Sequence, residues 1–175
     1  VRTCALPSST NVATPFYSEM AARIHDIAPD KLVFFDSTGL DAIRATTQLE
    51  RPEGDQLVFA PHFYDAAVFA GGSQLSLDYE PALQRWKTLG NDWDIPVLLG
   101  EFGIQPDHPQ ASAYVRNHYE SFDKLGLHAT YWEYSTSTEI WNYETLSITD
   151  EGGEEYSESV DEMVRPDAHA VAGRI

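Results

Sequence analysis

The sequence predicts an α/β fold in which helices alternate with the strands of a parallel sheet. Segments with apolar residues at helical spacing alternate along the chain with short runs rich in Val, Leu and Phe. No succession of hairpins interrupts this alternation, and strands separated by helices normally pair in parallel. The chain has 175 residues, of which 42% are hydrophobic, so it is long enough to bury one sizeable core.

Four elements are predicted in the first part of the chain. Residues 14–28 are expected to form a helix that Pro29 ends. The apolar positions at helical spacing in this segment are Phe16, Met20, Ile24 and Ile27. The run "KLVFFD" (31–36) is typical of a strand. A short helix is expected over 39–48, and "LVFAPHFY" (57–64) begins as a second strand.

Four further elements complete the pattern. Residues 78–90 are predicted to be helical, and "IPVLLG" (95–100) is the third strand. The apolar face of that helix consists of Leu83, Trp86 and Leu89. A helix over 109–125 is expected to end at Gly126, which suits a helix C-cap. The fourth strand is "LHATYWEY" (127–134).

Polar and aromatic residues stand at the ends of the last three strands. His62 and Tyr64 follow the second strand, Glu101 follows the third, and Trp132 and Glu133 lie near the end of the fourth. The glycine-rich phosphate loop of a Rossmann-type sheet is missing, because Gly71–Gly72 lacks the strand-to-helix context. Side chains that converge from successive strand ends are typical of a TIM-type (β/α)8 barrel, whose site lies at its carboxyl face.

The charge of the chain excludes some partners. Its formal net charge is −17, and the stretch between Lys124 and Arg165 holds ten acidic residues and no basic one. Such a surface repels phosphate backbones and anionic membranes, so we expect no nucleic-acid partner. We interpret "DEGGEEYSESVDEM" (150–163) as a solvated loop and helix face, since its acids lack the alternate spacing of a calcium loop.

Other compositional signals are weak or negative. No apolar run approaches the ~20 residues of a membrane span, and the first residues show no basic-then-apolar signal peptide. The chain opens on Val1, which is compatible with a processed or truncated end, and localisation stays open, with secretion among the options. Cys4 is the single cysteine, which excludes an internal disulfide and a cysteine-based metal cluster. We expect neither a metal nor a cofactor.

Three strand-end motifs resemble a known family. The motifs are "APHFYD" (60–65), "LLGEFG" (98–103) and "TYWEYS" (130–135). In order and spacing they are similar to strands six, seven and eight of glycoside hydrolase family five, the cellulase superfamily, and most similar to its endoglycoceramidase-like branch. Three more segments resemble that branch: 15–36, 140–148 and the tail 164–173. The tail departs from it at Asp167, where the branch usually has an aromatic residue.

The resemblance implies roles for four residues. Glu101 matches the nucleophile of a retaining mechanism, and Tyr64 matches a residue whose hydroxyl orients that nucleophile. His62 matches the active-site histidine of the family, and Trp132 offers an apolar face to the sugar ring beside the scissile bond. Taken singly, a tryptophan at a strand end is most often a core residue, and a lone histidine is most often only hydrogen-bonded.

The chain departs from the family at the second catalytic carboxyl group. The family places its acid/base Glu after an Asn at the end of strand four, and no Asn-Glu dipeptide occurs in this sequence. Glu133 and Glu144 do not match that position. We therefore expect residues 1–175 to be one partial catalytic-barrel domain, strands five to eight, without the N-terminal half-barrel and any C-terminal β-sandwich.

Two functional classes remain. The first is a retaining glycoside hydrolase that acts on β-glucosides, β-glucans or glycolipid glycans, with this fragment inactive on its own. The second is a non-catalytic half-barrel that binds carbohydrate or only folds. Four βα units leave two open sheet edges, which proteins rarely expose. The remaining half-barrel is then a separate chain, a further segment, a part lost by proteolysis, or a second copy of this chain.

Overall fold

The computed structural model describes residues 9–137, 139 and 145–165. Within these ranges, five helices and a π-helical turn flank or separate four strands, and a sixth helix follows them. The elements, in chain order, are η1 (Ser9–Ala13), α1 (Thr14–Ile27), β1 (Val33–Phe35), α2 (Gly39–Arg44), β2 (Leu57–Phe59), α3 (Ala66–Phe69), α4 (Glu80–Trp93), β3 (Leu98–Phe102), α5 (Ala111–Leu125), β4 (His128–Tyr131) and α6 (Ser157–Met163).

The four strands run parallel in the order in which they occur in the chain. β1 pairs with β2 and β3 pairs with β4, both in parallel. Two isolated parallel bridges, Phe59 to Val97 and His62 to Glu101, join β2 to the segment that contains β3. The predicted α/β class with a parallel sheet is therefore confirmed.

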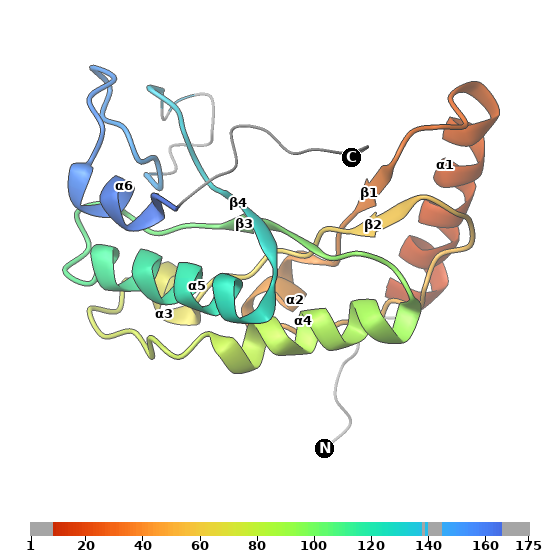
Figure 1. The fold of residues 1–175 in the computed structure, drawn as a ribbon, viewed down its shortest axis with the longest axis horizontal. Helices are drawn as coiled ribbons and strands as arrows, with labels where there is room; N and C mark the ends of the chain where they lie inside the picture. The colour runs from red at the N-terminus through yellow and green to blue at the C-terminus, as the bar shows by residue number, and fades with distance from the viewer. Residues whose placement is uncertain (1–8, 138, 140–144, 166–175) are drawn as a thin grey trace.

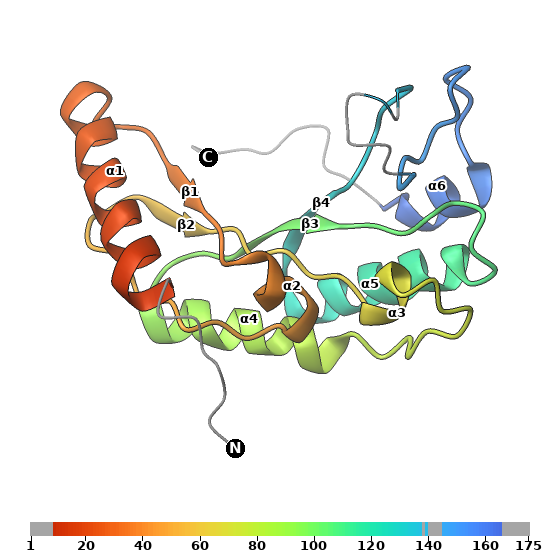
Figure 2. The ribbon, with the colours of Figure 1, turned by 180° about the vertical axis from the view of Figure 1, so that it is seen from behind.

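One face of the sheet packs against helices. Figures 1 and 2 show α4 and α5 side by side along this face, with α1 beside β1. Leu83 and Trp86 of α4 are fully buried, as their spacing predicts. Phe59 of β2 meets the Trp86 ring edge-on with ring centres 5.5 Å apart, and Phe35 of β1 lies 5.3 Å from Phe59. Aromatic burial of this kind stabilises the sheet-helix interface.

The side of the molecule around β1 exposes apolar residues. On the predicted apolar face of α1, Phe16 is 51% exposed, Ile24 40% and Ile27 88%. In β1, Phe35 is buried toward the helices, whereas its neighbour Phe34 is 52% exposed. Successive strand residues point to opposite faces, so Phe34 lies on the face away from Phe35.

Some element boundaries differ from the sequence prediction. The helix expected over 39–48 ends at Arg44, because Ala45 takes a left-handed conformation (φ 49°). The short helix α3 was not predicted; the Asp65 side chain caps it by accepting a hydrogen bond from the backbone N–H of Ala67. Gly126 ends α5 in a left-handed conformation, as predicted.

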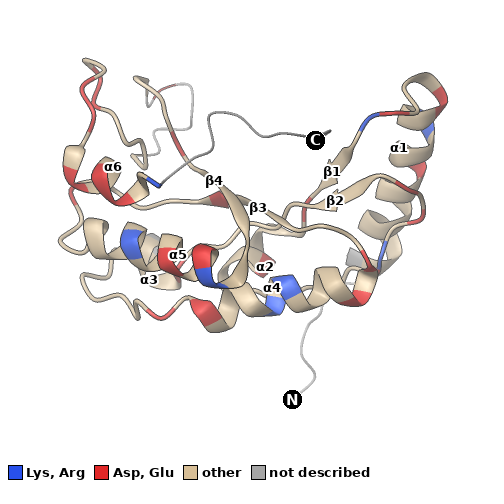
Figure 3. Ribbon diagram, in the orientation of Figure 1, with Lys and Arg blue, Asp and Glu red and all other residues tan. Residues whose placement is uncertain are grey.

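The acidic C-terminal part contains a solvated helix. α6 lies in the segment expected to be a loop and helix face, and Figure 3 shows acidic residues on α6 and on the loop before it. Arg116 of α5 forms an exposed ion pair with Glu162 of α6. Among the described residues, none of the helices has the length and apolar character that crossing a membrane requires.

Candidate active site

Three successive strands deliver polar side chains to one place. Asp36 directly follows β1, His62 lies three residues after β2, and Glu101 is the fourth residue of β3. The parallel bridge between His62 and Glu101 holds their backbones in register, and the Phe63 N–H donates to the Glu101 carbonyl oxygen at 3.0 Å. The carboxyl ends of these strands therefore form one edge at which the three side chains meet.

Two donors contact the same oxygen of Glu101. The Tyr64 hydroxyl donates to Oε2 at 3.0 Å, and His62 Nδ1 lies 3.1 Å from that oxygen. Among the residues that the structure describes, none forms a hydrogen bond to the other oxygen, Oε1. Tyr64 is only 5% exposed, whereas the Glu101 side chain is 27% exposed. The carboxylate is thus fixed through one oxygen and still accessible.

Asp36 is a member of the cluster that the sequence analysis did not single out. Its Oδ2 lies 3.4 Å from His62 Nε2, so the imidazole ring stands between two carboxylates. The backbone N–H of Ser37 donates to Asp36 Oδ1. A signal was present, because "KLVFFD" also ends a strand with an ionisable residue, as the other motifs do.

The surroundings shift the pKa values of His62 and Asp36. Burial by itself lowers the pKa of His62, but its hydrogen bond to Glu101 and the charges of Asp36 and Glu101 outweigh burial and raise it. Burial raises the pKa of Asp36, and the neighbouring His62 and the Ser37 N–H only partly offset this. The shift of His62 therefore comes from its two acidic neighbours, whereas the pKa of Asp36 is raised mainly by burial.

The two glycines of "GEFG" make room for the site. A Cβ atom on Gly100 would lie 2.7 Å from the Ala60 carbonyl oxygen and 3.0 Å from Cδ2 of the His62 ring. A Cβ atom on Gly103 would lie 2.0 Å from the Trp132 carbonyl oxygen. Close approach of β3 to its two neighbours therefore requires glycine on both sides of Glu101.

His62 and Glu101 of this cluster line a pocket of about 390 Å³. His62, Tyr64, Glu101 and Trp132 all line it, so the structure brings the four predicted site residues together. Leu146 and three residues of α2 complete the lining: Gly39, Ala42 and Ile43. The combination of a carboxylate, two hydrogen-bond donors and an aromatic ring suits a polar ligand with an apolar face.

Glu133, one of the other acids considered in the sequence, does not line this pocket. Glu133 is 5% exposed, and its backbone pairs with Leu146 and Ile148. Glu144 lies outside the described residues.

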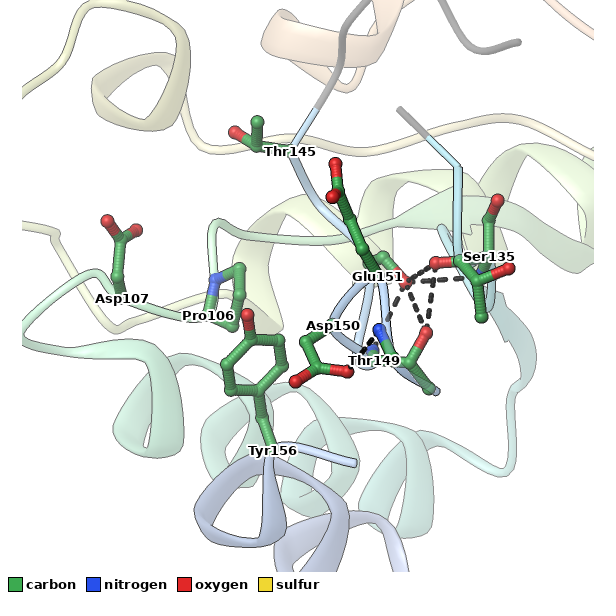
Figure 4. Close-up of a pocket in the computed structure, with 11 residues that line it drawn as sticks. Pro106, Asp107, Ser135, Thr145, Thr149, Asp150, Glu151 and Tyr156 are labelled. Atoms are coloured by element: carbon green, nitrogen blue, oxygen red, sulfur yellow. Dashed lines mark hydrogen bonds between the residues drawn. The ribbon is translucent and has the colours of Figure 1, made fainter. Parts of the chain in front are cut away.

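A larger pocket of about 540 Å³ lies away from Glu101 (Figure 4). It is formed by the loop after β3, including Asp107, and by the segment that leads to α6, including Asp150 and Tyr156. Ser147 and Thr149 hydrogen-bond to each other and to the Ser135 carbonyl oxygen, so these hydroxyl groups hold the loops together.

A comparison with protein-family models matches residues 5–138 to Cellulase (glycosyl hydrolase family 5). The chain belongs to this family. The matched range includes all the strands and Asp36, His62, Tyr64, Glu101 and Trp132. A comparison with curated proteins gives no match.

Solved structures support the same fold for this cellulase-family chain. The cellulose synthase subunit Z from Clostridioides difficile is similar with a TM-score of 0.65 and 18% identity, over 86% of this chain and 57% of the other. Endo-glycoceramidase II from Rhodococcus sp. gives 0.62 and 16%, over 82% and 34%. An endoglucanase gives 0.61 and 13%, over 83% and 54%. Other structures of the Rhodococcus enzyme are described as a ganglioside GM3 complex and a lactosyl-enzyme intermediate.

The cellulase-family chain is shorter than these proteins. It spans about half the length of the Clostridioides difficile and endoglucanase chains and about one third of the Rhodococcus enzyme. The fold in common with them is the TIM-type barrel of the family.

Proposed function

We propose that this chain is strands five to eight of a (β/α)8 barrel and supplies the nucleophile, Glu101, of a retaining glycoside hydrolase. The observation that carries the proposal is the pair of donors on Oε2 of Glu101, Tyr64 at 3.0 Å and His62 at 3.1 Å. They orient the carboxylate and leave Oε1 for attack. The membership of the chain in glycosyl hydrolase family 5 supports this assignment.

In this mechanism Glu101 attacks the anomeric carbon of the sugar. A bond forms between a carboxylate oxygen and that carbon while the bond to the leaving oxygen breaks, and the product is a glycosyl-enzyme ester. Water then hydrolyses the ester and restores the configuration of the substrate. Trp132 lines the same pocket and provides a face on which the sugar ring can pack.

The second carboxyl group has to come from outside these residues. Retaining enzymes hold an acid/base roughly 5–5.5 Å from the nucleophile, and this residue protonates the leaving oxygen. In our proposal it belongs to the N-terminal half of the barrel, because the sequence has no Asn-Glu dipeptide. The exposed Phe34 on β1 supports the same view, since it lies on the sheet face away from the helices, which becomes the covered interior when a barrel closes. A second copy of the chain is the alternative partner for the edge.

The proposed substrates are β-glucosides, β-glucans or glycolipid glycans. Neighbours described as an endoglucanase and as an endo-glycoceramidase in complex with a ganglioside support this range of substrates. The pocket residues also suit a sugar, because they combine hydrogen-bonding groups with an indole ring.

Replacement of the nucleophile tests the proposal. In the complete protein, we expect Glu101→Gln to lower the turnover of an aryl β-glycoside on the order of 10⁴-fold or more, while substrate binding is largely kept. The control is Glu53→Gln, which neutralises an exposed carboxylate in the loop before β2 and should leave turnover unchanged. Turnover by Glu101→Gln near that of the control would show that Glu101 is structural.

Azide rescue separates a nucleophile from an acid/base. In Glu101→Ala the space of the carboxylate is free, so azide should attack the anomeric carbon from the same face and give an α-glycosyl azide from a β-glycoside. Formation of the β-azide instead would assign Glu101 to the acid/base role and overturn the proposal.

A further inference from the structure

Asp36 and His62 extend the site beyond the groups that touch a substrate. His62 Nδ1 faces Glu101 Oε2 at 3.1 Å, and His62 Nε2 faces Asp36 Oδ2 at 3.4 Å. Asp36, His62 and Glu101 lie at the ends of three neighbouring strands, so the sheet fixes their order. We call these three residues the row. Gly100 lies beside the ring, because a Cβ atom added to it would be only 3.2 Å from Nε2.

The row has a defined protonation pattern. An ionised carboxylate only accepts hydrogen bonds, so a ring nitrogen that donates to one must carry a proton. His62 Nδ1 hydrogen-bonds to Glu101, and Nε2 makes a longer ion-pair contact with Asp36, so the doubly protonated imidazolium suits both carboxylates. One positive charge then stands between two negative charges, each side chain being about one third exposed or less.

We propose that Asp36 is a positioning residue that keeps His62 protonated while Glu101 is esterified in the glycosyl-enzyme intermediate. The inference rests on the proposed function of Glu101. Before attack, two carboxylates hold the imidazolium. When Glu101 becomes an ester its negative charge is lost, and Asp36 is then the acid that retains the proton on His62. His62 transfers no proton in this scheme; it is ready to donate to the carboxylate again once water has cleaved the ester.

The other charged and titratable groups around the row support this assignment. Tyr64 faces Glu101 and donates to it, while Tyr17 of α1 lies close enough to Asp36 for the negative charge to affect it. Burial, followed by the Asp36 charge, raises the pKa of Tyr17, so Tyr17 stays neutral. His62 itself has a raised pKa even though burial opposes this, because of Glu101 and Asp36. Among the described residues, Glu101 and Asp36 are the acids that raise the pKa of His62.

Asp36→Asn isolates the charge of Asp36. Asparagine keeps the size of the side chain and an oxygen that can accept from Nε2, but it removes the negative charge. NMR titration of the His62 ring in the 175-residue chain, assigned with His62→Gln, should show a lower midpoint in Asp36→Asn than in the wild type. The matched control is Asp55→Asn, an exposed residue just before β2, which should keep the wild-type midpoint. An unchanged midpoint in Asp36→Asn would overturn the inference.

Activity in the complete protein gives a second readout. With an activated substrate for which hydrolysis of the ester limits the rate, the alkaline limb of kcat should move to lower pH in Asp36→Asn, because His62 loses its proton earlier, while activity on the acidic side is largely kept. A uniform loss at every pH would assign Asp36 a merely structural role and contradict the inference. A lowered His62 midpoint in a protein without glycosidase activity would instead refute the proposed function and leave the Asp36–His62 coupling intact.

Discussion

Single residues explain why Glu101 is held where it is. Tyr64 and His62 fix one carboxylate oxygen, and Gly100 and Gly103 let β3 approach the chain on both sides. The motif "GEFG" is thus a packing requirement as well as a chemical one. Any side chain at Gly103 would displace the backbone at Trp132, which lines the same pocket.

Gly103→Ala should therefore destabilise the fold and disturb the site. Its Cβ atom would lie 2.0 Å from the Trp132 carbonyl oxygen, which is backbone and cannot rotate away. We expect a loss of about 1–3 kcal/mol or more in the free energy of unfolding, measured by urea denaturation. Gly39→Ala is the control, since nothing lies within 4 Å of its added Cβ. Equal stabilities of the two variants would contradict the close approach of β3 to Trp132.

The sequence predicted that four side chains would cluster, but it did not predict what supports them. His62, Tyr64, Glu101 and Trp132 lie near or just after the ends of predicted strands, and residues at the carboxyl ends of parallel strands meet at one edge. Asp36 was missed although "KLVFFD" ends a strand with an ionisable residue, because its contact with His62 joins two different strand ends. The helix α3, which follows the second predicted strand, was not predicted because its four residues are too few to show helical periodicity.

At the scale of elements, α5 holds β3 in place through a buried aromatic stack. His118 of α5 lies between Tyr79 and Phe102, with ring centres 4.0 Å and 4.9 Å away. Phe102 is the neighbour of Glu101 in β3, so this packing fixes the strand that carries Glu101. His118 is fully buried; its Nδ1 donates to the Tyr114 carbonyl oxygen, and within the described structure Nε2 has no hydrogen-bond partner.

The stack should make the stability of the protein sensitive to acid. Burial lowers the pKa of His118 to about 3, whereas in the unfolded chain it is near 6.5. The unfolded state binds the proton more readily, so stability is complete above about pH 6.5 and falls as the pH drops toward 3. Between pH 7 and pH 5, the wild type should lose roughly 2 kcal/mol more than His118→Phe in urea unfolding. The same pH dependence in both proteins would contradict a neutral, buried His118.

The β1 edge of the sheet and the neighbouring helix α1 expose apolar side chains. The periodicity of α1 predicted a helix correctly, but most of its apolar positions are exposed in this chain. Sequence patterns report which face of a helix is apolar and not what covers that face. The exposure of α1 and of Phe34 in β1 is consistent with the proposal that further strands or a second copy pack on this side.

At the scale of the whole molecule, we propose that the nucleophile and the acid/base belong to different halves of the barrel. Without an acid/base, the leaving sugar oxygen cannot be protonated, and general acid catalysis is typically worth ~10²–10⁴-fold. The isolated 175-residue chain should hydrolyse an unactivated β-linked oligosaccharide at the background rate. A dinitrophenyl β-glycoside needs no protonation of its leaving group, so it is the better substrate for this fragment.

Both assays should be run on a sample whose intact mass equals that of the 175-residue chain, which excludes a co-purified partner. Efficient cleavage of the unactivated oligosaccharide by this sample would refute the proposal that the acid/base lies outside the 175-residue chain. It would also place the second carboxyl group within these residues, and Glu133 and Glu144 would be the first to replace.

The central claim is that Glu101 forms a covalent bond to the sugar, and trapping of the intermediate tests it most directly. A dinitrophenyl 2-deoxy-2-fluoro-β-glycoside reacts without an acid catalyst and leaves an ester that water cleaves slowly. After incubation with the complete protein, mass spectrometry of the intact protein and of its proteolytic peptides shows whether and where the sugar is attached. We predict an increase of one fluorosugar, located on Glu101 and absent in Glu101→Gln. A fluorosugar on another residue, or none on a protein that turns over the parent glycoside, would contradict the account.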